Sequence, residues 1–337
     1  MPPPPLTAAV LIATYNRPDH LLTCLDHLKA QTVAPARVIV VDSSPDDRSE
    51  RVARAGGAVY LRNPLGRGHT ATSRMLGIAV AGDVDVIAFI DDDAYAAPDW
   101  LEQLLRRYDD PAVAGVGGRA ANGQPGEEHE GVDEIGLFRA DGTLTGNFAA
   151  DPGHDVDVDH FLGANMSLRM STLTAVGGIQ DYYPGTCLRE ESEIALRLRE
   201  AGCRLIYTPD AFAEHVGGTY AKGRRFDARY AYYGERNHLV LLARVVGPGG
   251  ARFRRYVLVG LGRVRGELAY ALRALSRRKL IGSTSIVTGV ANGVTKAVSV
   301  FAGLVAGLTL VLTGRVPRAK THIPRTLAIA PDQATDQ

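Results

Sequence analysis

The N-terminal part of the chain alternates short apolar runs with stretches in which apolar residues recur at a helical spacing. Apolar runs typical of buried strands occur at residues 8–13, 37–41, 58–61 and 84–90. After the first run, Leu21, Leu25 and Leu28 recur with the period of a helix. Strands that alternate with helices predict an α/β fold with a Rossmann-like, mostly parallel sheet that is flanked by helices.

Polar residues follow each apolar run. Residues 14–17 (Thr-Tyr-Asn-Arg) come after the first run, Asp42 comes after the second, and Asp91, Asp92 and Asp93 follow the fourth. The carboxyl ends of parallel strands meet at one edge of a sheet, so we expect these side chains to converge. Three adjacent carboxylates repel one another, and Mg2+ or Mn2+ carrying a phosphorylated ligand would offset that repulsion. The alternative is a solvated acidic turn that caps the next helix.

The middle of the chain is less regular. Residues 120–159 are rich in Gly, Asp and Glu and show little periodicity, which predicts a long loop beside the site. A helix is expected over 190–201, closed by Gly202, and a short strand over 205–207 is expected to end at Pro209. His215 lies just beyond that strand.

The last third combines basic and apolar segments. Arginines are frequent from residue 252 to 278, whereas Lys296 is the one ionisable residue from 280 to 314. Residues 297–314 are at the lower limit for spanning a bilayer, and both flanks of this apolar segment are basic. A single span would place one basic flank on the wrong side. The pattern therefore favours helices at a membrane surface or a packed pair of soluble helices over a true span.

Composition narrows the class of protein. The formal net charge of +1 argues against a protein that mainly binds nucleic acid, so no nucleic-acid partner is expected. Cys24, Cys187 and Cys203 have neither metal-ligand nor disulfide-framework spacing, and we interpret them as packing residues of a reducing compartment. Residues 1–5 lack the order of a signal peptide, which predicts a cytoplasmic protein.

The ordered set of motifs resembles family 2 glycosyltransferases of GT-A fold. The motifs are Ala13-Thr14-Tyr15-Asn16-Arg17, Val41-Asp42-Ser43, Ser73-Arg74, Phe89-Ile90-Asp91-Asp92-Asp93, Gly163-Ala164-Asn165, Arg189-Glu190-Glu191 and Tyr207-Thr208-Pro209 through His215. The resemblance implies a glycosyltransferase domain over 1–240, with a nucleotide-sugar half at 6–119 and an acceptor half at 160–240. A helical extension at 241–320 and a flexible tail at 321–337 would follow. The sole tryptophan, Trp100, lies outside any Gln-x-x-Arg-Trp motif, so the non-processive, rhamnosyltransferase-like branch is the better match.

The resemblance also assigns roles to individual residues. The expected donor-binding residues are Thr14, Tyr15, Arg17, Asp42, Arg74, Asp91 and Asp92. The expected ligands of Mg2+ or Mn2+ are Asp93, Asp91 and His215. Glu191 aligns with the catalytic base, although this chain has Glu-Glu where the family has Glu-Asp. Asn165, Glu190 and Arg236 are expected to contact the acceptor or phosphate, whereas Glu193 is expected to pair with Arg197 within the helix.

The resemblance therefore implies an inverting, metal-dependent transfer of one sugar from a UDP-, dTDP- or GDP-linked donor to a hydroxyl. The acceptor would be a cell-envelope glycan, a lipid-linked glycan or a small molecule. The enzyme is expected in the cytoplasm, with peripheral contact to the membrane through residues 280–314 as one option. A nucleotidyltransferase acting on a sugar phosphate and a non-catalytic module that binds nucleotide sugars are the alternatives.

Overall fold

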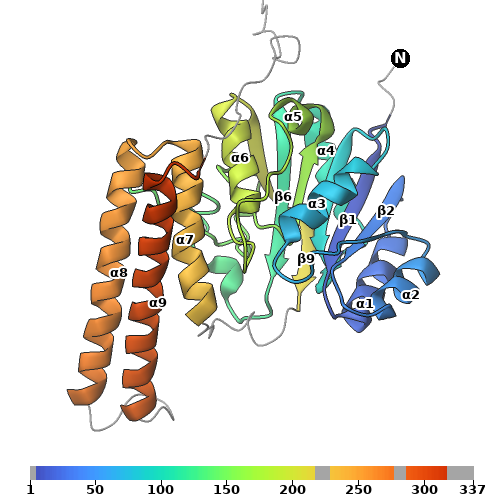
Figure 1. The fold of residues 1–337 in the computed structure, drawn as a ribbon. Helices are drawn as coiled ribbons and strands as arrows, with labels where there is room; N and C mark the ends of the chain where they lie inside the picture. The colour runs from blue at the N-terminus through green and yellow to red at the C-terminus, as the bar shows by residue number, and fades with distance from the viewer. Residues whose placement is uncertain (1–4, 217–227, 277–285, 317–337) are drawn as a thin grey trace, which may run out of the picture.

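A computed structural model describes residues 5–216, 228–276 and 286–316 (Figure 1). Among these residues one nine-stranded sheet forms the centre of the molecule, in the order β3-β2-β1-β4-β8-β6-β9-β5, with β7 beside β9. Its strands are β1 (Ala8–Thr14), β2 (Arg37–Asp42), β3 (Val59–Arg62), β4 (Val86–Asp91), β5 (Ala94–Ala96), β6 (Val113–Ala121), β7 (Val156–Asp157), β8 (Asn165–Arg169) and β9 (Arg204–His215). The mixed α/β fold expected from the sequence is confirmed.

The first four strands run parallel, as expected. β1 lies between β2 and β4, with Thr14 opposite Asp42 and Ala13 opposite Asp91. The second half of the sheet is mixed, because β8 runs antiparallel to both β4 and β6 whereas β9 runs parallel to β6. The parallel part brings three polar strand ends to one edge.

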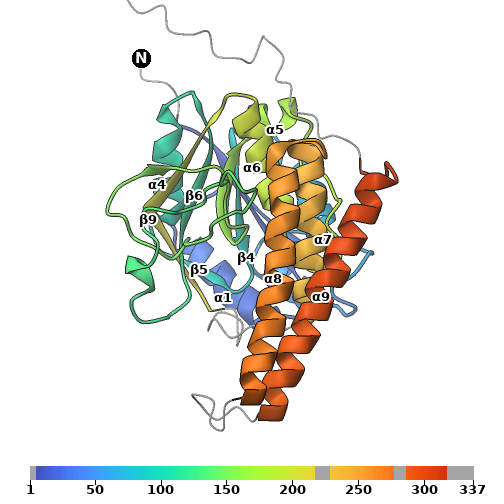
Figure 2. The ribbon, with the colours of Figure 1, turned by 90° about the vertical axis from the view of Figure 1, so that its left-hand side faces the viewer.

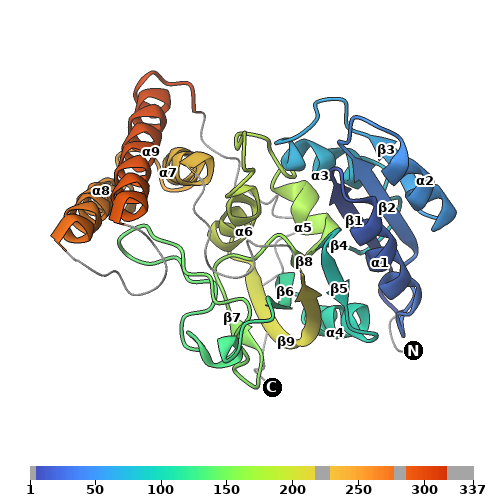
Figure 3. The same cartoon turned by 90° about the horizontal axis from the view of Figure 1, so that it is seen from below.

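Helices cover both faces of the sheet (Figure 3). Two separate apolar cores lie between these helices and the sheet. One core lies under α3 (Thr70–Ala79), α5 (Met170–Ala175) and α6 (Glu190–Glu200). The other lies under α1 (Pro18–Lys29), α2 (Arg48–Ala55) and α4 (Trp100–Arg106). Because neighbouring residues of a strand point to opposite faces, Leu11 and Phe89 enter the first core whereas Val10 and Ala88 enter the second.

Two elements differ from the sequence-based expectation. The strand expected over 205–207 is β9, which continues past Pro209 to His215. Proline is tolerated there because the pairing of β6 with β9 is irregular between Gly118 and Ala120, which leaves that stretch out of register. The segment 120–159 is mostly loop, as expected, apart from the end of β6, a short 3-10 turn and β7.

Three C-terminal helices form a separate layer: α7 (Ala228–Val245), α8 (Ala251–Ser276) and α9 (Ile286–Leu312). Figures 1 and 2 show α8 and α9 as a long pair that extends past the sheet. Gly303 and Gly307 allow α9 to lie against α7, because a Cβ at either position would meet Tyr232 or Leu239 at under 3.0 Å. The expected boundary at residue 240 falls inside α7, and the expected tail at 321–337 lies outside the described residues.

Candidate active site

A cleft of about 670 Å3 opens at the carboxyl edge of the parallel strands. Its wall includes Thr14, Tyr15 and Arg17 after β1, Asp91 and Asp92 at the end of β4, Arg74 from α3, Glu190 and Glu191 at the start of α6, and His215 from β9. The cleft thus brings together residues from both halves of the chain. Nine of the sequence-predicted site residues line it.

An acidic group with one imidazole lies at the base of the cleft. One ligand atom from each of Asp91, Asp93 and His215 lies within 4.8 Å of the others. His215 reaches this position because β5 and β9 pair antiparallel, with Ala94 opposite His215. The backbone N–H of Val216 also donates to the Asp93 carbonyl at 2.9 Å. The last residue of the long strand β9, His215, therefore supplies the third side chain of this group.

Arg17 supplies positive charge to the same carboxylates. Its guanidinium donates to Asp92 at 3.1 Å and also to Asp93. Burial alone would raise the pKa of Asp93, but the hydrogen bond from His215 and the charge of Arg17 hold that pKa below its ordinary value. Burial and the charge of Asp93 raise the pKa of Asp92 to about 7, while Thr14 donates to this carboxylate at 2.7 Å. The three aspartates therefore differ in environment.

These side chains fit a divalent cation. Asp91 and Asp93 offer hard carboxylate oxygens, which suit Mg2+ and Mn2+, and the imidazole of His215 favours the softer Mn2+. Asp93 already holds its proton weakly, as a metal ligand must. If a cation binds, Asp93 would exchange its hydrogen bond with Arg17 for a bond to the cation. Among the described residues this is the one such group of three or more His, Cys, Asp or Glu side chains.

Asp42 lies beneath a smaller hollow beside the cleft. The hollow measures about 430 Å3 and is lined by Tyr15, Ser43 and Arg62, among others. Asp42 itself is fully buried and accepts hydrogen bonds from the Ser44 N–H at 2.7 Å and the Tyr60 hydroxyl at 3.1 Å. Its carboxylate therefore fixes the shape of this hollow from below.

Arg74 joins the two halves of the chain across the cleft. Its guanidinium donates to Glu190, the first residue of α6, and to the Gly163 carbonyl at 2.8 Å. It lies 4.0 Å from Asp91 and stacks on the ring of Phe89 with 5.2 Å to the centroid. A Cβ at residue 163 would approach the guanidinium to 2.7 Å, so glycine is required for this contact.

Glu190 and Glu191 begin α6 inside the cleft. The residue before them, Arg189, has φ of 90°, which turns the chain sharply into the helix. Burial and the charge of Glu191 raise the pKa of Glu190 to about 8 despite Arg74, and one oxygen of Glu190 is buried without a hydrogen-bond partner. Burial likewise raises the pKa of Glu191. A carboxylate with a raised pKa is suited to accept a proton near neutral pH.

Two side chains that were expected to contact the acceptor or phosphate lie outside the cleft. Asn165 is fully buried and uses its amide within the core, accepting from the Trp100 indole and donating to the carbonyls of Arg119 and Ala211. Arg236 donates to the Tyr182 carbonyl and does not line the cleft. The contacts of Asn165 and Arg236 with acceptor or phosphate are therefore not supported by geometry, because both side chains hold protein segments together.

The expected pair of Glu193 and Arg197 is present and belongs to a larger buried network. Glu193 lies 3.5 Å from Arg197 and accepts from Arg244 of α7 at 2.8 Å. Tyr183 also donates to it. This network ties α6 to α7 and so fixes the helix that carries Glu190 and Glu191.

Some of the residues that line the cleft were not predicted from the sequence. Cys187, expected to be a packing residue, lines the cleft, and its sulfur accepts from the Thr70 N–H at 3.3 Å. Arg229 and Tyr230 of α7 also line the cleft. The cluster of aromatic residues in 230–233 was the one signal in the sequence for their role. All three described cysteines are free.

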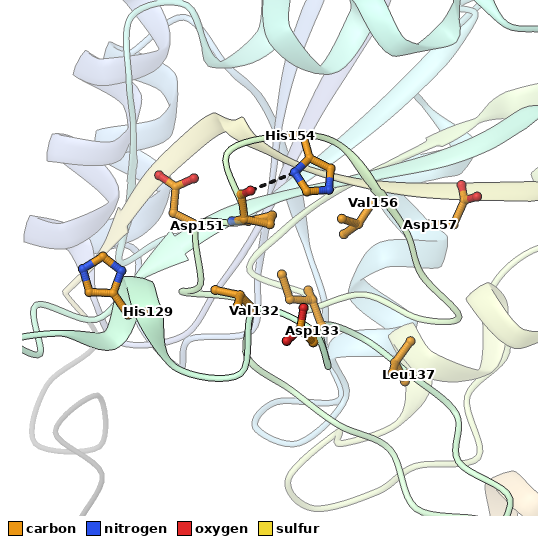
Figure 4. Close-up of a pocket in the computed structure, with 10 residues that line it drawn as sticks. His129, Val132, Asp133, Leu137, Asp151, His154, Val156 and Asp157 are labelled. Carbon is orange, nitrogen blue, oxygen red and sulfur yellow. Dashed lines mark hydrogen bonds between the residues drawn. The ribbon is translucent and has the colours of Figure 1, made fainter.

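A second cavity, of about 460 Å3, lies among the loop residues 129–157 (Figure 4). Its His129 and His154 belong to different turns, and His154 is engaged with the Pro152 carbonyl at 2.8 Å. Among the described residues, the histidines and aspartates of this cavity do not form a group of three that could hold a metal ion. The cleft at the edge of the sheet is therefore the better candidate for the active site.

Comparisons with known proteins agree with this geometry. The model of glycosyl transferase family 2 matches residues 9–168. A pre-mycofactocin glycosyltransferase of Mycobacterium tuberculosis is 31% identical over 242 residues, which cover 69% of this chain and 49% of that protein. A glucosyl-dolichyl phosphate glucuronosyltransferase of Haloferax volcanii is 28% identical over 235 residues, which cover 62% and 69%.

The fold is shared with a solved structure of a mannosyltransferase from Pyrobaculum calidifontis in complex with GDP-Man and Mn2+. The TM-score is 0.59 at 18% identity, and the match covers 91% of this chain and 88% of that chain. The chain spans about half the length of the Mycobacterium tuberculosis relative that it matches. From its motifs, fold and relatives, the chain belongs to glycosyl transferase family 2, with the GT-A fold.

Proposed function

We propose that this protein is a metal-dependent, inverting glycosyltransferase that moves one sugar from a nucleotide diphosphate donor to a hydroxyl acceptor. The single observation that carries the proposal is the cleft itself. Asp91 and His215, which group with the buried Asp93, line the same cleft as Glu191, whose pKa is raised. A site for a diphosphate and a base for a hydroxyl therefore share one space.

Each half of the cleft has its own task in this proposal. Tyr15 and the hollow above Asp42 would hold the nucleoside, while Arg17 and Arg74 would meet the diphosphate. Asp91, Asp93 and His215 would hold Mn2+ or Mg2+, which when bound neutralises the charge that develops on the leaving diphosphate. Asp92 would stay beside Arg17 as a supporting contact.

Glu191 would act on the acceptor. Its carboxylate takes the proton of the acceptor hydroxyl as that oxygen forms a bond to the anomeric carbon. The bond from the anomeric carbon to the diphosphate breaks on the opposite face, and the nucleoside diphosphate leaves with the bonding electrons. One displacement of this kind inverts the anomeric configuration. The contact between Arg74 and Glu190 would hold the start of α6 against the donor side of the cleft.

The C-terminal helices suggest an acceptor at a membrane surface. Residues 288–312 of α9 are long and apolar enough to cross a membrane, and 28% of the most apolar window is buried. Val294, Val298, Phe301 and Val305 form one exposed stripe of this helix. We infer that α8 and α9 lie on the cytoplasmic face of a membrane and that the acceptor is a lipid-linked or cell-envelope glycan. The relative from Haloferax volcanii is named as a glucuronosyltransferase of glucosyl-dolichyl phosphate, which is a lipid-linked sugar.

A thermal-shift screen tests the donor half of the proposal. The full chain is heated with UDP-, dTDP- and GDP-sugars, each with and without Mn2+. A ligand that binds the folded state alone raises the melting temperature, so at least one donor should stabilise the chain and do so far more with Mn2+. If none of these donors stabilises the chain under either condition, the proposal is wrong.

A further inference from the structure

A cavity of about 800 Å3 lies between α7, α8 and α9, away from the sheet. That volume falls within the range of about 300–1,000 Å3 that is typical of small-molecule sites. Its walls come from all three helices and from Leu188 and Arg189, which lead into α6. Leu188 and Tyr230 also line the active-site cleft, so the two spaces adjoin.

We propose that this helical pocket binds the anchor of the acceptor, a hydrocarbon chain that carries a phosphate-class anion, while the reacting hydroxyl lies in the cleft. The assignment as an acceptor site rests on the proposed glycosyltransferase function. The binding of such a molecule by the pocket does not depend on it.

The apolar part of the wall suits a hydrocarbon chain. Leu188, Ala231, Tyr270 and Val300 line the pocket. Gly234 of α7 and Gly266 of α8 also line it, and a Cβ built at either position meets nothing within 4 Å. These glycines therefore leave open space at the wall. Residues of α8 and α9 line the pocket, and the same two helices carry exposed leucines and valines outside it.

The charged part of the wall suits an anion. Arg263 donates to Glu235, and Lys296 lies 2.6 Å from Glu267, so both carboxylates of the pocket already have a cationic partner. Arg189 is the remaining cation among the lining residues. Its Nε is buried without a hydrogen-bond partner in the described part of the chain. A phosphate oxygen would accept from this N–H in a charge-assisted hydrogen bond.

The position of Arg189 links this pocket to the chemistry. It directly precedes Glu190 and Glu191, and it makes the turn into α6. An anion at Arg189 therefore lies at the border between the pocket and the proposed base. An acceptor held in this way would extend from the cleft past Leu188 into the pocket.

Matched glycine substitutions test the inference. Phenylalanine at Gly266 or Gly234 fills the pocket, whereas phenylalanine at Gly262 of the same helix α8 enters open space outside it. All three positions are helical, and replacing glycine within a helix does not reduce helix propensity. Binding of farnesyl phosphate, farnesol and inorganic phosphate to the full chain is measured by calorimetry, and donor binding is measured by thermal shift.

We expect farnesyl phosphate to bind more tightly than farnesol or phosphate alone. Gly266→Phe and Gly234→Phe should each weaken its binding by about tenfold or more, while Gly262→Phe stays within about twofold of the parent chain. The inference is overturned if the parent chain does not bind farnesyl phosphate, or if all three variants bind it equally well. If the parent chain binds no nucleotide-sugar donor, that result would count against the proposed function. It would not count against the pocket, because the binding of farnesyl phosphate is measured without a donor.

Discussion

Arg74 of α3 and Glu190 of α6 form a buried ion pair that connects the nucleotide-sugar half of the chain to the acceptor half. Arg74 is 4% exposed and Glu190 is 3% exposed, so removal of either side chain leaves the other buried without this partner. The pair also places Arg74 within 4.0 Å of Asp91. The two halves of the proposed reaction are thus coupled through one side chain.

Removal of Arg74 should destabilise the fold. We expect Arg74→Leu to lower the free energy of unfolding by about 3–5 kcal/mol, because Glu190 and the Gly163 carbonyl then lose their buried hydrogen-bond donor. The double variant Arg74→Leu with Glu190→Leu should lose less than the sum of the single variants. Urea unfolding of the four chains measures this coupling. Strict additivity would show that the pair does not connect the two halves.

Glu191 should be required for transfer but not for donor binding. Glu191→Gln keeps the size of the side chain and removes its basicity, so turnover should fall by about 100-fold or more. The melting shift with donor and Mn2+ should stay as in the parent chain. Glu200→Gln, an exposed change on the same helix, is the control and should leave turnover unchanged. Normal turnover of the Glu191 variant would remove this residue from the mechanism.

The raised pKa values at the start of α6 predict the pH dependence. Glu191 must be ionised to accept a proton, so kcat/KM should fall as the pH drops through an apparent pKa above the ordinary glutamate value. Arg189→Gln removes a positive charge that holds this pKa down, so it should move the acid limb to higher pH. A profile that stays flat down to the ordinary glutamate value would contradict the assignment.

The exposed stripe of α9 should determine membrane binding. The full chain should float with anionic liposomes, and added salt should weaken this binding because α8 is rich in arginine. Val298→Glu and Phe301→Glu, at positions that are 61% and 51% exposed, should abolish flotation. Leu22→Glu on α1, at a position that is 47% exposed, is the matched control. Flotation that survives both α9 changes would contradict this surface.

Much of the donor half follows from the sequence. The runs that became β1, β2 and β4 are short, apolar and bounded by polar residues, so their pattern fixes both the strands and the convergence of Thr14, Asp42 and Asp91 at one edge. The start of α6 was equally visible, because acidic residues favour the first turn of a helix. These features depend on local pattern alone.

Contacts between segments that are distant in sequence could not be predicted from local patterns. The full length of β9 depends on its pairing with β6 and β5, which lets the strand continue past Pro209 to His215. The buried hydrogen bond from the Trp100 indole to Asn165 joins two segments that are distant in sequence. The pocket between α7, α8 and α9 likewise exists because the three helices pack together. No single segment carries a pattern for it.

Release of nucleoside diphosphate tests the central claim most directly. The parent chain and Asp93→Ala are incubated with UDP-, dTDP- and GDP-sugars, with and without Mn2+, and the released nucleotide is measured. We expect at least one donor to be hydrolysed to nucleoside diphosphate and free sugar, with water in place of the acceptor hydroxyl, in a Mn2+-dependent reaction that Asp93→Ala abolishes. Release that is equal in both chains, or release of pyrophosphate from nucleoside triphosphates in place of this reaction, would contradict the account.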